Sequence, residues 1–466
     1  MHAGGSDAFL VVLDPNGSSL VYASFLGGTG SETGYALALG STGIAYVTGT
    51  TSVGGFPEVA ATNYPDGGTD VFVTKFDIAQ SGAASVLYSA RIGGGPFSQC
   101  TSHGIAVDDA GNAYVTGSTG FGNGTFPVTA GAYSTTYATG IDGTAAYLFK
   151  LGNTLPATLV YSTFLGAGMG TSVAVNGASG EAFVSGTTYT PQFPTTPGAL
   201  QTAHGGGTDA FVLRMNAAGN ALIYSTFLGG PGYDESTDIV ANGVNEAYVV
   251  GIARDGFPTS PDALQPALAG GLYQDLWVVQ LNSTGSAYGC GGSTYFGGTS
   301  EEYYGSFYDF LAPSISLQDH DGIQDTLSIN ATSHSEDLPT TPGVYEENKV
   351  NGISDQPIFF KLSCAAMAIA PEAGFNSTAA PTCTGGVVDF ADASLFGATS
   401  WNWSFPGGVP STSSASDPQD IAYASPGTYD VTLIACNAVG CDTLTQQITL
   451  VVQPPPSVNL GNDTSF

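Results

Sequence analysis

The chain has 466 residues, of which 38 are Asp or Glu and 7 are Lys or Arg, so its formal net charge is −31. Such an acidic chain repels a phosphate backbone, which excludes nucleic acid as a partner. Only 10% of the chain is charged, whereas 42% is hydrophobic and 66 residues are glycine. This composition excludes a disordered acidic tail and favours β-structure with many turns over a helical bundle.

Signals for membranes and secretion are absent from the sequence itself. No apolar run approaches the roughly 20 residues that a membrane-spanning helix needs. The stretch from Met1 to Asp7 has neither the basic nor the apolar region of a signal peptide. We therefore expect no membrane span, and we expect that a leader was removed or that the sequence is a fragment.

An internal repeat organises the first three quarters of the chain. A short apolar motif, as in Asp209–Met215, recurs six times at intervals of roughly 60 to 80 residues. A second motif, as in Leu222–Gly230, follows the first five copies, and Gly104–Asp108 with Asn112–Gly117 illustrates the two pieces that come next. Each period thus holds four runs rich in Val, Ile, Tyr, Phe and Thr, separated by Gly, Asn and Asp turns. Four strands per period predict the blades of a β-propeller.

These recurring strings resemble the SBBP family, the seven-bladed β-propeller repeats of bacterial secreted and surface proteins, over roughly residues 7–362. With the blade order that the resemblance implies, the chain opens with the third and fourth strands of one blade and closes with a third strand. We predict an all-β fold in which residues 1–364 form a propeller of about six four-stranded blades, with the ring closed by both termini. A larger ring truncated at its N-terminus is the alternative.

A different β-rich unit follows at residues 368–453. Its strings Trp401–Gly408 and Ser425–Leu433 resemble the PKD domain, a small immunoglobulin-like β-sandwich of bacterial exoproteins. The segment Phe405–Gly408 lacks the aspartate that the family usually has there, which puts any role of that acid in doubt. Residues 454–466 are predicted to be a proline linker and the start of a further module.

The cysteines favour an oxidising, extracellular compartment. Cys436 and Cys441 flank a predicted hairpin loop, so they are candidates for a disulfide. Pairing of Cys383 with either of them, or of Cys290 with Cys364, is also open, because six cysteines allow fifteen connectivities.

Candidate binding residues gather in the long loops that strand alternation places on one face of the predicted disc. They are acids with neighbouring tyrosines: Glu32, Tyr233, Asp234, Glu235, Glu301, Glu302, Tyr303 and Tyr304. Paired carboxylates beside aromatics could hydrolyse a glycosidic bond, bind sugar, hold calcium, or form a solvated rim. We favour a role without catalysis, because no repeat supplies a distinctive acid in surroundings that would raise its pKa.

A second set of acids lies at Asp319, Asp321 and Asp325, with spacing similar to that of a calcium loop. This set also occupies the place of an inner hairpin turn, where Asp-Gly is ordinary, and we favour the turn. No cofactor is expected, with calcium left open. His103 opens a predicted inner strand, and it is predicted to be a loop residue rather than a catalytic base. The Phe-Pro pairs that recur at Phe56, Phe126, Phe193 and Phe257 are predicted to be packing plugs.

The residues and the resemblance together predict a secreted or cell-surface, non-enzymatic binding or adhesion protein that recognises an extracellular polysaccharide or a surface protein. One alternative is a self-associating structural subunit of an extracellular filament or surface layer. Another is a carbohydrate-active enzyme or its targeting module. Fold alone does not choose among them.

Overall fold

The computed structural model describes residues 4–52, 55–62, 64, 68–95, 98–120, 125–138, 140, 143–269, 274–300, 312–318, 326–335, 338, 356–363, 371, 373–379, 386–394, 398–437 and 440–450. The chain forms two compact units, one of Met1–Thr259 with Ala267–Cys364 and another of Ala365–Phe466 with Ser260–Pro266. The described residues form β-strands and one short 3-10 helix, η1 (Gly82–Ser85). Among them no helix is long and apolar enough to cross a membrane.

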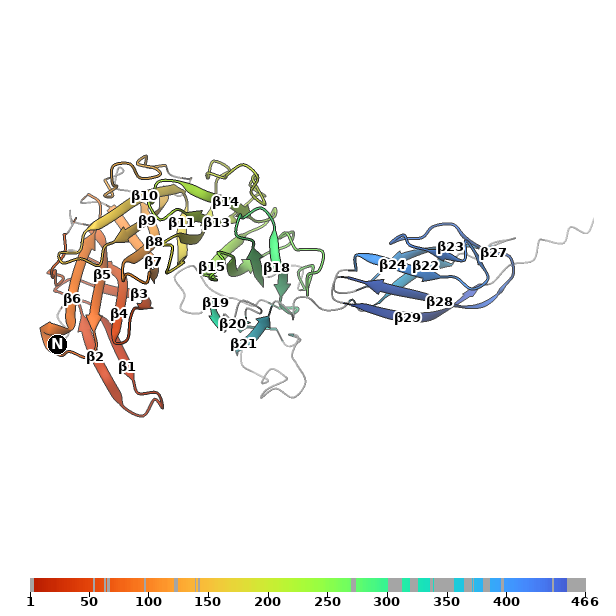
Figure 1. Cartoon of the computed structure of the whole chain (residues 1–466), viewed down its shortest axis with the longest axis horizontal. Helices are drawn as coiled ribbons and strands as arrows, with labels where there is room; N and C mark the ends of the chain where they lie inside the picture. Colours follow the sequence, from red (N-terminus) through yellow and green to blue (C-terminus); the bar gives the residue numbers. More distant parts are fainter. Residues whose placement is uncertain are drawn as a thin grey trace, which may run out of the picture. The chain divides into compact units, whose positions relative to one another are not determined.

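The first unit is built of antiparallel sheets that follow one another in chain order, as in a β-propeller (Figure 1). Four complete blades have their strands in the order of the chain: blade two (β3 Glu32–Leu39, β4 Ile44–Thr51, β5 Gly68–Asp77, β6 Val86–Ile92), blade three (β7 Ser98–Val107, β8 Ala113–Gly120, β9 Thr144–Leu151, β10 Leu159–Ala167), blade four (β11 Met169–Val175, β12 Ala182–Thr188, β13 Asp209–Met215, β14 Leu222–Leu228) and blade five (β15 Asp234–Ala241, β16 Ala247–Ala253, β17 Asp275–Leu281, β18 Tyr288–Phe296). A short parallel pairing of Gly68 with Ser98 joins blades two and three.

Two incomplete blades flank this series. They are blade one (β1 Ala8–Leu13, β2 Leu20–Leu26) and blade six (β19 Ser314–Gln318, β20 Thr326–Ser333, β21 Gln356–Ser363). The predicted sealing of the ring by both termini is not found in the part of the chain that the structure describes. Blades one and six are separate sheets there, and no backbone pairing joins β1 or β2 to β21. Blade one consists only of the third and fourth strands of the repeat, so the inner strands that would complete its sheet are not supplied by blade six.

The core of the first unit lies between consecutive blades, because both faces of the central blades are apolar and buried. The Phe-Pro phenylalanines contribute to it in blades two to five. Each is at most 4% exposed, and each stacks on an aromatic ring of the third strand: Phe56 on Phe72, Phe126 on Tyr147, Phe193 on Phe211 and Phe257 on Trp277, with ring centroids 4.9, 4.4, 4.0 and 4.7 Å apart. The prediction that these residues are packing plugs is confirmed.

The second unit is an immunoglobulin-like sandwich of two four-stranded sheets. One contains β22 (Phe375–Ala379), β23 (Gly386–Asp392), β27 (Ile421–Tyr423) and β25 (Gly408–Val409), and the other contains β26 (Thr412–Ser413), β24 (Ser400–Ser404), β28 (Gly427–Cys436) and β29 (Cys441–Leu450). Their facing side chains form one core around the buried Trp403, with Phe390 and Phe405 beside it. Cys436 and Cys441 form a disulfide at the ends of the paired strands β28 and β29.

Candidate functional site

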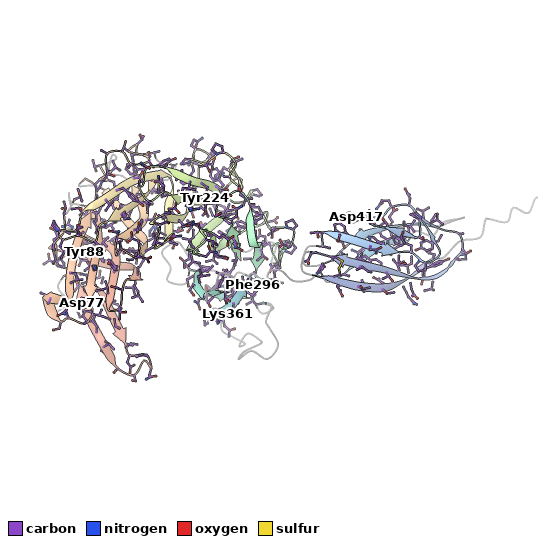
Figure 2. All side chains as sticks on the ribbon, in the orientation of Figure 1. Asp77, Tyr88, Tyr224, Phe296, Lys361 and Asp417 are labelled. Carbon is purple, nitrogen blue, oxygen red and sulfur yellow. A yellow bond between two sulfur atoms is a disulfide. The ribbon has the colours of Figure 1, made fainter. Side chains whose placement is uncertain are left out.

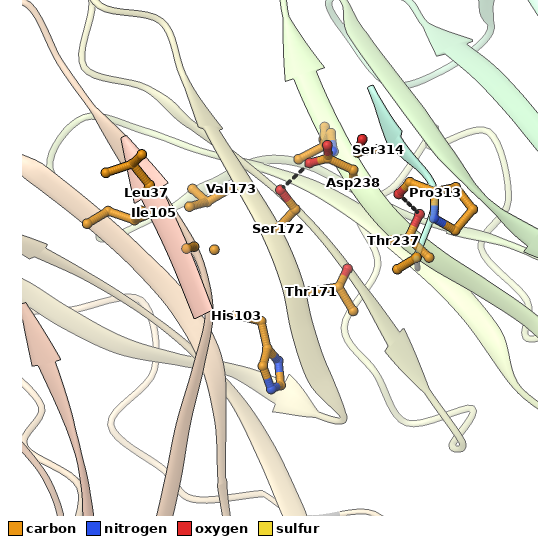
Figure 3. A pocket seen from close by; sticks show the side chains of 14 residues that line it. Leu37, His103, Ile105, Thr171, Ser172, Val173, Thr237, Asp238, Pro313 and Ser314 are labelled. Atoms are coloured by element: carbon orange, nitrogen blue, oxygen red, sulfur yellow. Dashed lines mark hydrogen bonds between the residues drawn. The ribbon is translucent and has the colours of Figure 1, made fainter. Parts of the chain in front are cut away.

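The innermost strands of blades two to six line one cavity of about 300 Å³ in the first unit (Figure 3). Blades three, four and five contribute the same three positions of the repeat: His103–Ile105, Thr171–Val173 and Thr237–Ile239. The apolar lining consists of Leu37, Ile105, Val173 and Ile239, which pair with corresponding residues of the second strands. The cavity therefore lies where the axial channel of a propeller is expected.

A β-bulge recurs at one register of these innermost strands. The pairing shifts between Ser102 and Gly104 in β7, between Gly170 and Ser172 in β11, and between Ser236 and Asp238 in β15. The extra residues, His103, Thr171 and Thr237, all line the cavity. Because a bulge redirects side chains locally, the repeat places these polar side chains in the cavity beside the apolar residues that follow them.

Asp238 is the acid of this cavity. Its Oδ1 accepts hydrogen bonds from the Ser172 hydroxyl (2.7 Å) and the Ile239 N–H (2.9 Å), and its Oδ2 accepts one from the Ile315 N–H (3.0 Å). Burial raises the pKa of Asp238, and these three donors oppose the rise. With both oxygens engaged, the carboxylate links the innermost strands of blades four, five and six.

Two other side chains that line the cavity, those of Thr237 and His103, also make polar contacts. The Thr237 hydroxyl donates to the Pro313 carbonyl oxygen at 2.7 Å, and Figure 3 shows this bond beside the Ser172–Asp238 bond. His103 lies within β7 rather than in a loop, which corrects the expectation for this residue. Its Nδ1 lies 3.0 Å from the Gly170 carbonyl oxygen, and burial lowers the pKa of the ring. His103 is therefore neutral at neutral pH.

Two of the predicted loop-face acids, Glu32 and Asp234, are buried. Each is the first residue of an innermost strand and is at most 1% exposed. Glu32 accepts hydrogen bonds from the Gly28 N–H (2.9 Å) and the Thr51 hydroxyl (2.8 Å), and Asp234 accepts one from the Gly230 N–H at 2.6 Å. These acids therefore hold the glycine loops that lead from one blade to the next.

Asp234 and Glu235 cannot act as a convergent carboxylate pair. As successive residues of β15, their side chains point to opposite faces of the sheet. Burial raises the pKa of each to about 7, with the nearby Asp209 raising that of Asp234 further and Arg254 opposing the rise at Glu235. The expectation that no acid of the repeats lies in surroundings that raise its pKa is therefore wrong. Next to these two acids, the side chain of Tyr233 is 48% exposed, and the Arg254 guanidinium lies 5.1 Å from its ring centroid. Of the predicted loop-face residues that the structure describes, Tyr233 is thus the most exposed.

The remaining candidates lie outside the described residues. These are Glu301, Glu302, Tyr303 and Tyr304 of the loop face and Asp319, Asp321 and Asp325 of the proposed calcium loop. Within the described ranges, no group of three or more His, Cys, Asp or Glu side chains is arranged to hold a metal ion.

The sequence analysis missed the channel residues Thr171, Ser172, Thr237 and Asp238. The available signal was the alignment of the innermost strands, in which Thr171 and Ser172 of one repeat correspond to Thr237 and Asp238 of the next, just before the apolar Val173 and Ile239. A bulge cannot be located from that correspondence alone, because it shifts the alternation by one residue.

Two family models match this chain, one within each unit. The model of SBBP, a β-propeller repeat, matches residues 87–124, and the model of the PKD domain matches residues 375–451. A comparison with curated proteins finds no match.

Several solved structures are similar to the chain at low identity. They include an acylaminoacyl peptidase in complex with Z-Gly-Gly-Phe-chloromethyl ketone (10% identity, 89% of this chain, 52% of that chain, TM-score 0.31), the acylaminoacyl peptidase of Pyrococcus horikoshii (11%, 89%, 52%, 0.31) and the hydrazine synthase of Kuenenia stuttgartiensis (12%, 59%, 77%, 0.26). The chain spans about half the length of the two peptidases.

Proposed function

We propose that this chain, which carries an SBBP β-propeller repeat and a PKD domain, is an extracellular or cell-surface binding protein without catalytic activity. Its partner would be an extracellular polysaccharide or a surface protein. The excess of 38 acids over 7 basic residues and the disulfide of the second unit agree with an extracellular setting.

One observation carries the non-enzymatic part of the proposal. Two of the acids predicted for the loop face, Glu32 and Asp234, are buried and accept hydrogen bonds from glycine loops. Asp234 and Glu235 are successive residues of β15 and point to opposite faces of the sheet, so they do not form the convergent pair of carboxyl groups that glycoside hydrolysis uses. Tyr233 remains as an exposed aromatic ring on the same loop face, and such a ring suits stacking against a sugar or packing against a protein.

A pull-down assay, which measures how much of the chain stays bound to insoluble polysaccharides or cells, tests this proposal. The purified chain is incubated with a panel of insoluble polysaccharides and cell surfaces, with and without a chelator, and released sugars are then assayed. Retention without sugar release is the expected result. Sugar release would favour the carbohydrate-active enzyme, and loss of retention in chelator would implicate calcium held by the acidic loops.

A matched pair of variants locates the surface. Tyr233 precedes β15, whereas Val244 lies at the opposite end of the same hairpin and is 60% exposed. Tyr233→Ala is expected to weaken retention, and Val244→Ala is expected to leave it unchanged. Equal retention of both variants would exclude Tyr233 from the binding surface.

A further inference from the structure

Blade one exposes an apolar surface on one face. Phe9, Val11 and Leu13 alternate along β1 and are 69%, 45% and 52% exposed. On the other face of β1, Ala8 and Leu10 are each 5% exposed and pack in a cluster with side chains of blade two. Blade one is therefore covered on the side of the following blade and uncovered on the other side.

The internal repeat shows what normally covers this uncovered side. In the Asp-Ala-Phe motif, Phe9, Val11 and Leu13 correspond to Phe211, Leu213 and Met215 of blade four. Those three are fully buried, in one cluster with Ala146 and Leu148 of the preceding blade three. The exposed face of β1 thus has the residues of a surface that a preceding blade covers.

Comparison between repeats shows which exposed apolar side chains of blade one are unusual. Val21 on β2 is 57% exposed, but its counterparts Val160 and Ile223 are also 54% and 40% exposed on complete blades. Exposure of an outer strand at that position is therefore a normal feature of the repeat. The exposure of Phe9, Val11 and Leu13 is not.

Blade six exposes the complementary face. Phe360 stacks on Phe296 of blade five, with ring centroids 4.1 Å apart. The adjacent Phe359 points to the other side of β21 and is 59% exposed. Its counterpart in blade four, Val212, is fully buried in a cluster with Ile239 and Val249 of the following blade. Phe359 of blade six is therefore uncovered on the side where a following blade packs, as Phe9 of blade one is uncovered on the side where a preceding blade packs.

A polar contact recurs between consecutive blades at the same strand. Lys75 Nζ donates to Asn153 Oδ1 at 2.5 Å, and Arg214 donates to the Ser283 carbonyl oxygen at 2.7 Å. Both contacts run from the third strand of one blade to the turn between the third and fourth strands of the next. Lys361, which is labelled in Figure 2, holds this position in blade six. Its side chain is exposed.

The corresponding turn of blade one carries an acid. Asp14 is exposed, and hydrogen bonds from Ser18 lower the pKa of its carboxyl group. Asp14 is therefore ionised at neutral pH. Blade six presents a cation at the position of Lys75 and Arg214, and blade one presents an anion next to Pro15, which holds the position of Asn153 and Ser283 in the repeat.

We propose that blade six of one copy of this chain docks on the exposed face of blade one of a second copy, so that Phe359 packs against Phe9 and Val11 and Lys361 approaches Asp14. Both faces are exposed in the single chain, which leaves each available to another molecule. The contact is heterologous, because the two surfaces differ, and it joins copies head to tail. This inference rests on the repeat geometry and does not depend on the ligand proposed above.

Two surface variants and their mixture test the proposal. Phe9→Thr with Val11→Thr removes the apolar face of blade one, and Phe359→Thr with Lys361→Glu removes the face of blade six. Molar mass is measured by light scattering over a wide concentration series of the full chain. The unmodified chain is expected to grow beyond a dimer, each variant alone is expected to stay monomeric, and their mixture is expected to stop at twice the monomer mass.

Other results would overturn the proposal. An unmodified chain that stays monomeric throughout the series would show that the faces close within one molecule or bind a different protein. Association of the blade-six variant alone would indicate that two copies of the blade-one face meet. Val160→Thr serves as the control for loss of an exposed apolar residue, and it should associate as the unmodified chain does. Thermal unfolding of each variant shows whether it is folded.

Discussion

Gly49 on β4 lies directly opposite Phe72 on β5, and a Cβ atom on Gly49 would lie 2.7 Å from the Phe72 ring and would also collide with the Thr33 carbonyl oxygen. The same relationship recurs in the next three blades, where Gly117 faces Tyr147, Gly186 faces Phe211 and Gly251 faces Trp277. The glycine provides the space that the large ring of the third strand occupies. In blade six the third strand has Ile358 instead, and its partner is Ala331.

This relationship predicts that Gly49→Ala destabilises the propeller unit. The added methyl group cannot be accommodated without displacing the Phe72 ring or β3, and such overpacking typically costs about 1–3 kcal/mol. Gly34 lies opposite Gly49 on β3, but a Cβ atom there would make only ordinary contacts, the nearest at 3.6 Å from Ala8. Gly34→Ala is therefore the matched control and should leave the urea midpoint nearly unchanged. Equal destabilisation by both variants would contradict the steric explanation.

A second prediction concerns the pH dependence of stability. Burial raises the pKa of Asp234 from 3.8 to about 7. Between these values the folded chain holds a proton that the unfolded chain releases. The stability associated with this carboxyl is therefore full below about pH 4 and is lost as the pH rises towards 7, by up to about 4 kcal/mol.

Asp234→Asn should remove this part of the pH dependence and raise the stability at pH 8 relative to the unmodified chain. Thermal unfolding at several pH values between 4 and 8 measures the effect. Asp255→Asn, at an exposed turn of the same blade, is the control for loss of one negative charge. If both variants show the same pH profile, general charge repulsion in the acidic chain explains the dependence.

The strands and the packing plugs could be predicted from the sequence because they depend on local patterns. Apolar runs bounded by glycine turns recur in each repeat. A Phe-Pro pair, such as the one at Phe193, also recurs after the second strand of blades two to five. The burial of Glu32 and Asp234 could not be predicted in the same way. An acid at the end of a loop is usually solvated, and only the three-dimensional path of the glycine loop shows that its N–H groups point at the carboxylate.

The channel and the ends of the blade series required tertiary information. Asp238 reaches the cavity because of a bulge, and its partners Ser172 and Ile315 come from two other blades. Counting strands predicted one closed ring, but a count does not show whether the face of Phe9 meets the face of Phe359. That outcome depends on the accumulated rotation from blade to blade, which no single repeat encodes.

The plug phenylalanines provide a third prediction. Phe193 is 3% exposed and stacks on Phe211 at a centroid distance of 4.0 Å. Phe193→Ala removes this contact and leaves a cavity, which typically costs about 3–5 kcal/mol. Leu155→Ala removes an apolar side chain that is 67% exposed, and it should change the stability little. Chemical denaturation measures the free energy of unfolding of the two variants. A small effect of Phe193→Ala would show that the Phe-Pro segment is not required for packing.

The final prediction separates the two units. The disulfide between Cys436 and Cys441 closes a short loop at the end of the β28–β29 pair, with a sequence separation of 5. Loop-closure entropy for a ring of this size amounts to about 2 kcal/mol of stability. Replacing both cysteines by serine should therefore lower the unfolding temperature of the PKD unit by several degrees and leave that of the propeller unit unchanged. Scanning calorimetry resolves this if the units unfold separately, and a matching shift of both transitions would show that they unfold as one cooperative body.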